Sequence, residues 1–276
     1  MIRKVAVADG FYPKSPGLLL EELNRCFSKG FGNLPEFGNE KKPIGGIVPH
    51  AGYTYSGSVA SYTYATIRAY KKPETVVIVG PNHTGYGSDV SVWYEGEWET
   101  PLGSLKIDEE VSRILLKDFP EFTYEAHEFE HSIEVQLPFI YYTFGPEVKI
   151  VPVCVLDQSL KKMIKLGESL SAAVNGKNVA LLASSDFTHY EPQKVAMSND
   201  LQVIQAILRL DEKEVIKVAD ELGVNACGLG PIISVINCLK KLGKVEAKML
   251  KYSTSGDATG NYDSVVGYAS VVFFVR

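Results

Sequence analysis

Three of the five histidines follow directly on apolar, strand-like runs. They are His50 after Ile-Val-Pro, His83 after Ile-Val-Gly-Pro-Asn, and His189, which lies three residues after Asp186 in Ser-Ser-Asp-Phe-Thr-His. Ligands of α/β proteins collect outside the carboxyl ends of parallel strands, so imidazoles delivered from three strands should converge. Such a group can hold a metal ion or transfer protons. The alternative is that each histidine only ends its own strand.

Cys227 is the next candidate for chemistry. It stands in Asn-Ala-Cys-Gly-Leu-Gly-Pro, just before a predicted helix whose Pro231 suits the first helical turn. A helix N-terminus favours the thiolate, which is the form that binds metals. The alternative is a small buried residue in a turn. The other three cysteines, Cys26, Cys154 and Cys238, lie in apolar segments and are predicted to be core residues.

The segment His127-Glu-Phe-Glu-His131 fits the H-E-x-x-H pattern of zinc peptidases. That pattern needs both histidines on one helical turn, whereas the apolar periodicity of the following helix begins only at Ile133. We therefore expect His127 to lie away from the site and the helix to begin near His131. His131 and Glu134 are three residues apart and would share a helix face. They could serve the site as a hydrogen-bonded pair, or they could be a cap and a solvated face.

Other common catalytic motifs are absent from the sequence. It contains no G-x-S-x-G elbow, no Walker-type loop and no G-x-G-x-x-G fingerprint. A net charge of −5 gives no basic footprint for nucleic acid. No segment approaches the ~20 apolar residues that span a bilayer, and the first apolar stretch is too short for a signal peptide. We therefore expect a cytoplasmic protein that binds neither nucleic acid nor membrane.

Strand-like and helical segments alternate along the chain, which predicts an α/β three-layer sandwich with a mostly parallel mixed central sheet. No repeat or linker stands out, so residues 1–276 are expected to form a single domain. The predicted parallel strands are Ile44–Val48, Thr75–Gly80, Val148–Leu156 and Asn178–Ser184, and Lys244–Ser253 and Ser264–Val275 form a closing pair, potentially antiparallel. The predicted helices are Gly57–Ala69, Asp108–Lys117, Ser132–Phe144, Leu160–Val174, Lys194–Leu210, Lys213–Leu222 and Pro231–Leu242, with a hairpin around Val90–Tyr94.

Several long motifs make the sequence resemble the MEMO family, named after a mediator of ErbB2-driven cell motility. They are Pro-His50-Ala-Gly-Tyr-Thr-Tyr-Ser-Gly, Gly-Pro-Asn-His83, Glu-His131-Ser-Ile-Glu-Val-Gln-Leu-Pro-Phe, Ser-Ser-Asp186-Phe-Thr-His-Tyr and Cys227-Gly-Leu-Gly-Pro. The family fold is similar to that of class III extradiol dioxygenases, which hold iron(II) with two histidines and a glutamate. The resemblance implies that His50 and His83 are metal ligands, that His189 matches the catalytic acid/base, and that Cys227 replaces the carboxylate ligand.

A thiolate ligand is softer than a carboxylate and suits iron, copper or zinc, so the standard extradiol reaction is not expected. The resemblance implies iron(II), with copper or zinc as alternatives, and a redox role on a small aromatic or other oxidisable substrate. His189 would then move protons while Asp186 or His131 orients it. The alternative function is a catalytically silent adaptor that binds a peptide or small ligand at the same place, because fold alone does not decide between the two.

Overall fold

Four continuously apolar segments form the centre of the computed structural model, which describes residues 1–276. All four pair in parallel with one another. Almost every residue in them is buried, because helices cover both faces of the sheet. In spatial order, these strands are β2 (Ile44–Val48), β8 (Val179–Ser184), β3 (Thr75–Pro81) and β7 (Lys149–Val155).

Antiparallel strands extend this centre on both sides, so the eight-stranded sheet is mixed. The two C-terminal strands pair with each other in antiparallel register, as predicted, and the second of them also pairs with β2. The flanking strands are β10 (Val245–Thr254), β11 (Val265–Val275), β9 (His189–Glu191), which pairs with β11, and β4 (Val90–Val92), which pairs with β7.

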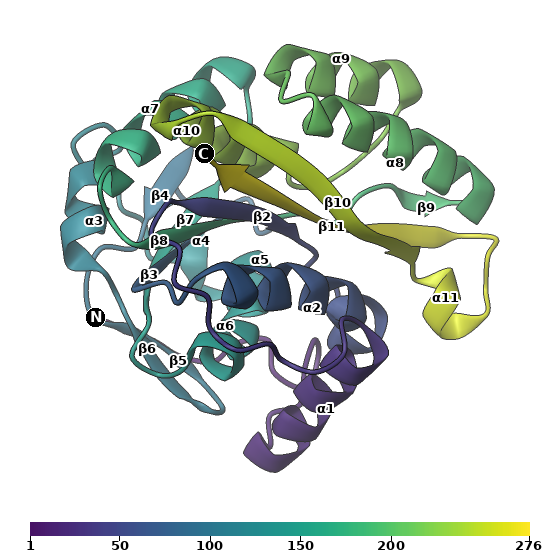
Figure 1. Ribbon diagram of the computed structural model, residues 1–276, viewed down its shortest axis with the longest axis horizontal. Coiled ribbons are helices and arrows are strands. Elements are labelled where there is room, and N and C mark those ends of the chain that lie inside the picture. Colours follow the sequence, from purple (N-terminus) through teal and green to yellow (C-terminus); the bar gives the residue numbers. More distant parts are fainter.

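Two layers of helices enclose the sheet and confirm the three-layer α/β architecture (Figure 1). Successive strand residues face opposite layers: Val76 and Ile78 pack against one layer, and Val77 and Val79 pack against the other. The first layer contains α1 (Pro16–Lys29), α2 (Tyr53–Tyr70), α5 (His131–Glu134) and α6 (Gln136–Phe144). The second contains α3 (Glu109–Leu115), α7 (Leu160–Val174), α8 (Gln193–Leu208), α9 (Glu212–Leu222) and α10 (Leu229–Leu242).

The predicted hairpin around Val90–Tyr94 is wrong. Val90–Val92 instead pairs with β7 as an edge strand of the main sheet. A short apolar run predicts a strand but not the strand with which it pairs. Here Val90–Val92 pairs with the buried strand β7 and not with the residues that follow it in the sequence. The hairpin lies further along the chain, in a second sheet of β1 (Ile2–Arg3), β5 (Glu97–Thr100) and β6 (Gly103–Lys106). Two single-turn helices complete the fold, α4 (Glu125–Glu128) and α11 (Gly256–Thr259).

The chain connections define one functional edge of the sheet. β2 continues into α2 in the first layer, whereas β7 continues into α7 in the second layer. β8 then enters the sheet between β2 and β3. The carboxyl ends of β2, β8 and β3 therefore lie side by side. The connection after β2 leads to the first layer of helices and the connection after β8 leads to the second, and open α/β sheets bind ligands where such connections diverge. None of the helices combines the length and the apolar composition needed to span a lipid bilayer.

Candidate metal centre

Polar side chains follow each of the three neighbouring strands β2, β8 and β3. His50 comes two residues after β2, Asp186 two residues after β8, and His83 two residues after β3. His131 is the first residue of α5, which packs against the end of β3. The approach is so close that a Cβ atom on Gly80 would lie 2.6 Å from the Ser132 hydroxyl oxygen. Only glycine leaves room for this helix start beside the strand.

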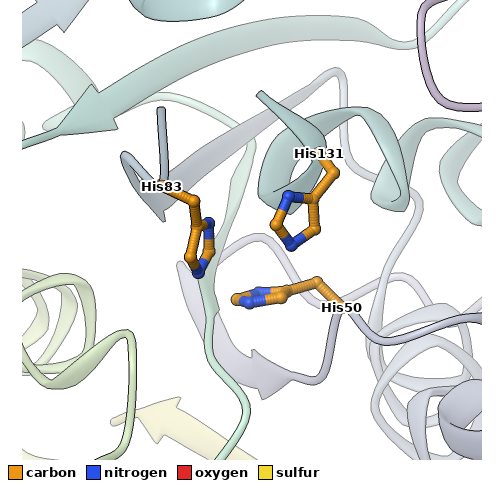
Figure 2. A group of neighbouring side chains, drawn as sticks. All are labelled: His50, His83 and His131. Carbon is orange, nitrogen blue, oxygen red and sulfur yellow. The ribbon is translucent and has the colours of Figure 1, made fainter. Parts of the chain in front are cut away.

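Three imidazoles converge at this edge (Figure 2). His50, His83 and His131 each offer one potential ligand atom, and these atoms all lie within 4.8 Å of one another. The ring centroids of His83 and His131 are 4.3 Å apart and stacked, and the His50 ring meets both edge-on. The third imidazole of this compact group is thus His131 from a helix, and not His189 from the end of β8.

The protein holds two of these rings, those of His50 and His131, in the neutral form that binds metals. Burial holds the pKa of His50 well below its usual 6.5, and the neighbouring histidines lower it further. Burial likewise lowers the pKa of His131 to about 4, despite the opposing charge of Glu130. A metal ion requires deprotonated imidazole nitrogens, so the folded chain presents ligands that need not lose protons at neutral pH.

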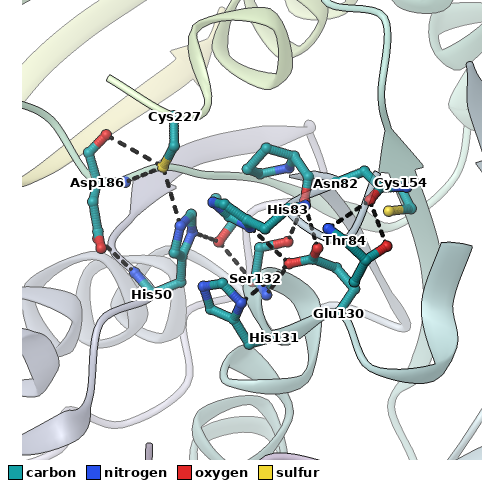
Figure 3. A network of polar contacts seen from close by, with 12 residues as sticks. His50, Asn82, His83, Thr84, Glu130, His131, Ser132, Cys154, Asp186 and Cys227 are labelled. Carbon is teal, nitrogen blue, oxygen red and sulfur yellow. Dashed lines mark hydrogen bonds and ion pairs between the residues drawn. The ribbon is translucent and has the colours of Figure 1, made fainter. Parts of the chain in front are cut away.

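A fully buried carboxylate orients two of the three rings (Figure 3). Glu130 lies 2.9 Å from His83 Nδ1 and 3.5 Å from His131 Nδ1, and it accepts hydrogen bonds from the backbone N–H groups of His83 and Ser132. Burial alone would raise its pKa, but the contacts with His83 and His131 outweigh burial and lower it to about 2. A carboxylate on Nδ1 leaves Nε2 for a metal, which is the usual outer contact of a histidine ligand.

A serine fixes the tautomer of His50. The Ser184 hydroxyl lies 2.8 Å from His50 Nδ1 and donates its proton to the Ser132 carbonyl at 2.7 Å. Since a hydroxyl has one proton to donate, it must accept the second bond from an N–H at Nδ1 of His50. The lone pair of this neutral imidazole is therefore on Nε2.

The thiol of Cys227 lies against this same nitrogen. Its Sγ atom is 3.1 Å from His50 Nε2 and accepts a hydrogen bond from the Asp186 backbone N–H at 3.3 Å. Burial, and secondarily the charge of Asp186, raise the pKa of the thiol above its usual value. The expected effect of the helix N-terminus is therefore outweighed by burial. A thiolate here needs a positive charge beside it, and a bound cation would supply one.

The loop that carries Cys227 is clamped on both sides. The Gln158 side chain donates to the Cys227 carbonyl at 2.8 Å and accepts from the Gly230 backbone N–H at 2.8 Å. Gly228 donates its N–H to the Ser185 hydroxyl, and a Cβ atom on this glycine would lie 2.3 Å from the Ser184 carbonyl oxygen. The thiol is thus fixed by the backbone around it.

Asp186 and His189 lie near the cluster in different ways. Asp186 accepts the His50 backbone N–H at 2.8 Å, and burial raises the pKa of its carboxyl group to about 7. His189 begins β9, and its backbone N–H donates to the Asn225 side chain at 2.7 Å. Burial lowers the His189 pKa, and the charge of His83 lowers it further. No hydrogen bond joins His189 to Asp186 or to His131.

His127 lies outside the cluster, as expected. It belongs to α4, whereas His131 begins α5. Its Nε2 atom contacts the Ser91 hydroxyl at 3.0 Å, and its ring packs edge-on against Trp93 and Trp98. The two histidines of the H-E-x-x-H pattern therefore do not share a site, and the zinc-peptidase alternative has no support in the structure.

The residues at this edge fit a transition metal. Three imidazoles and a neighbouring thiol are nitrogen and sulfur donors, and such donors favour zinc, copper or iron over magnesium or calcium. The carboxylate of Glu130 contacts Nδ1 of His83 and leaves Nε2 of this ring free to bind a metal.

Comparisons with known proteins identify the family of the chain. The sequence model described as Memo-like protein matches residues 3–272. The chain belongs to the Memo-like family. MEMO1 family proteins of Methanopyrus kandleri and Methanocaldococcus jannaschii are 43% and 42% identical to it, over 99% and 98% of both chains respectively. A crystal structure of an uncharacterized protein from Escherichia coli K12 has a TM-score of 0.55 and 12% identity, covering 83% of this chain and 98% of that chain, so it supports the fold alone.

The Memo-like motifs quoted from the sequence all place residues at or beside the cluster, but the sequence alone does not reveal which residues support the rings. Glu130 stands at the start of one quoted motif with no role assigned to it, and Gln158 lies in none of the motifs. The position of Glu130, directly before a histidine at a helix start, is compatible with many roles. Only the fold brings its carboxylate to His83, which is 47 residues away in the sequence.

Proposed function

We propose that this Memo-like protein binds one redox-active transition metal ion, iron(II) or copper, through His50, His83 and Cys227, with His131 as a further nitrogen donor. The observation that carries the proposal is the convergence of three imidazoles with a thiol at Nε2 of His50. His131 is assigned to the donor set because its ring lies with the other two. It has no hydrogen bond to His189 that would let it orient that residue.

The proposed activity is oxidation of a small aromatic or other oxidisable molecule. A bound iron or copper ion would supply one-electron chemistry and a Lewis acid at this edge of the sheet. The chain itself would contribute orientation and proton transfer. Glu130 and Ser184 hold the rings of His83 and His50, and the neutral His189 beside the cluster would accept a proton from the substrate.

The test of metal binding compares two cysteine variants after purification without chelators. Cys227→Ser should lower the affinity for iron and copper by more than the ~10–100-fold that loss of an outer contact costs. Cys238→Ser is the matched control, because Cys238 is a residue of α10 that is buried in the apolar core of the protein. This variant should keep wild-type metal content. Metal affinity unchanged in Cys227→Ser would assign this thiol to packing and contradict the proposal.

The test of turnover uses His189→Ala and measures metal content together with oxygen uptake on catechol-type substrates. If His189 transfers protons, the variant should keep its metal and lose ~10²–10⁴-fold in rate. Loss of both metal and activity would make His189 a ligand. A wild-type chain that binds metal but oxidises none of these substrates would favour the adaptor function, in which the same place binds a peptide or small ligand.

A further inference from the structure

The N-terminal segment of the chain is fastened to the helix turn that carries His131. Glu134, the last residue of α5, is fully buried, and its carboxylate forms an ion pair with the fully buried guanidinium of Arg3. Burying two charges is costly unless each is paired and hydrogen-bonded, so both must find further partners. The contacts of these two residues define what the pair holds together.

The carboxylate of Glu134 gathers the backbone of the N-terminal segment. It accepts hydrogen bonds from the backbone N–H groups of Ala6 and Val7 at 3.0–3.2 Å and from the Tyr12 hydroxyl. These donors come from residues that are more than 120 positions away in the sequence. A single side chain thus fixes the path of residues 6–12 past α5.

The guanidinium of Arg3 holds the backbone on the other side of His131. It donates to the carbonyl of His127 at 3.0–3.1 Å and to the carbonyl of Glu130 at 3.1 Å. Glu130 is the residue whose carboxylate contacts His83 and His131. The Arg3–Glu134 pair therefore brackets the segment from Glu130 to Glu134 at both of its ends.

The same N-terminal segment also touches His131, a proposed nitrogen donor, directly. The Phe11 ring stacks on the His131 ring, with centroids 4.6 Å apart and planes 22° apart. The Phe11 carbonyl accepts the backbone N–H of Tyr53, the residue that begins α2 three positions after His50. The segment thus joins the helix starts that follow His50 and carry His131.

We infer that Glu134 is a positioning residue of the metal centre, and that Arg3–Tyr12 forms a strap that holds Glu130 and His131 in their binding arrangement. This inference rests on the proposed metal binding. It adds that the strap and the metal stabilise each other, because coupling between two sites is reciprocal. Loosening the strap lowers metal affinity, and binding the metal protects the strap from local opening.

The experiment uses the full chain with Co²⁺ as the metal probe, followed by its absorption and by amide hydrogen exchange. Glu134→Gln removes the charge and keeps the side-chain shape. It should lower Co²⁺ affinity about 10–100-fold, the range for residues that orient ligands. Asp108→Asn is the control, because Asp108 is also a buried carboxylate that accepts a side-chain hydrogen bond, but it lies at the amino end of β3. This control should keep wild-type Co²⁺ affinity.

Phe11→Ala provides a second variant that leaves the buried ion pair intact. Phe11 is only half-buried, so this variant should fold, and loss of the ring contact with His131 should weaken Co²⁺ binding about 2- to 10-fold. In the wild type, Co²⁺ should slow exchange of the Ala6 and Val7 amides. Glu134→Gln should abolish that protection.

The outcomes separate this inference from the proposed function. Wild-type Co²⁺ affinity in both Glu134→Gln and Phe11→Ala would overturn the strap, as would Co²⁺ binding that leaves the Ala6 and Val7 exchange rates unchanged. A wild-type chain that binds neither Co²⁺ nor iron would instead refute metal binding. The strap is then judged in the metal-free chain. If the Ser132 and Ile133 amides exchange at the same rate in Glu134→Gln as in wild type, the strap is refuted.

Discussion

His127 and His131 lie four residues apart, and His127 is fully buried while His131 is half-buried, yet burial is not the main difference between their surroundings. His127 is fully buried between Trp93 and Trp98, with Ser91 on Nε2 and no partner for Nδ1. His131 stands between Phe11 and His83, with a carboxylate beside its Nδ1. The first ring is a packing element with a single polar contact. The second has an ordered polar environment and faces other potential ligands.

The difference arises from the break between the two short helices. α4 ends at Glu128 and α5 begins at His131, so the two side chains do not share a helix face. Glu130 lies in the break and caps α5 by accepting the Ser132 N–H, while its carboxylate reaches His83. A sequence motif such as H-E-x-x-H therefore has its chemical meaning only when one helix carries both histidines. Here a cap residue between them becomes the functional partner of one.

The largest expected effect comes from removing each ring in turn. His131→Ala should lower metal affinity by more than ~100-fold. It removes a proposed donor atom, and this should cost more affinity than the loss of an outer contact. His127→Ala should leave metal affinity unchanged but destabilise the fold by ~2–4 kcal/mol, since it leaves a cavity between two tryptophans. Metal titration and chemical denaturation of both variants measure the two effects. The same metal loss in both variants would contradict the separation of their roles.

Replacing the polar partners of the two rings should have intermediate effects on metal affinity and on stability. Glu130→Gln keeps a hydrogen-bonding group at His83 but removes the charge, and should lower metal affinity ~10–100-fold. Ser91→Ala removes the one polar partner of His127, and should cost ~1–3 kcal/mol of stability with no change in metal affinity. Isothermal titration of the folded variants checks the first value. A Glu130→Gln protein with wild-type affinity would show that the carboxylate serves only as a helix cap.

Much of the fold could be predicted from the sequence, because its central strands and long helices carry strong periodic patterns. The predicted bounds of the four parallel strands and of α7 agree with the structure to within one residue. The long helix predicted over Ser132–Phe144 is interrupted, since α5 ends at Glu134 and α6 begins at Gln136. α1 was not predicted, although its buried residues follow helical spacing, and the partner of Val90–Val92 could not be known from local pattern.

The candidate site was predictable to a different extent. Residues that follow strands, such as His50 and His83, meet because parallel strands of one sheet end at the same edge, which the strand pattern suggests. The place of His131 could not be derived in this way, because it depends on how α5 packs against β3. Arg3 carried no signal at all. Its role arises from contacts with residues more than 120 positions away, which local sequence patterns do not encode.

The smallest expected effect is the contribution of His127 to the pH dependence of folding stability. Burial, with the charge of Arg3, lowers the pKa of His127 to about 3, although Glu130 opposes this shift. Between that value and the usual 6.5, the unfolded chain binds a proton at His127 that the folded chain does not bind. This residue therefore makes stability rise with pH across that window, and acidification below pH 6.5 removes the contribution progressively.

His127→Phe should flatten this dependence by at most ~1.4 kcal/mol per pH unit, because one proton is involved. At neutral pH its stability should stay within ~1–2 kcal/mol of wild type, since the ring still fills the space and the unpartnered Nδ1 is removed along with the Ser91 contact. Urea denaturation of metal-free wild type and variant between pH 4 and 7 measures the difference in slope. Parallel pH profiles in the two proteins would show that His127 keeps a normal pKa, and would contradict its description as a desolvated packing element.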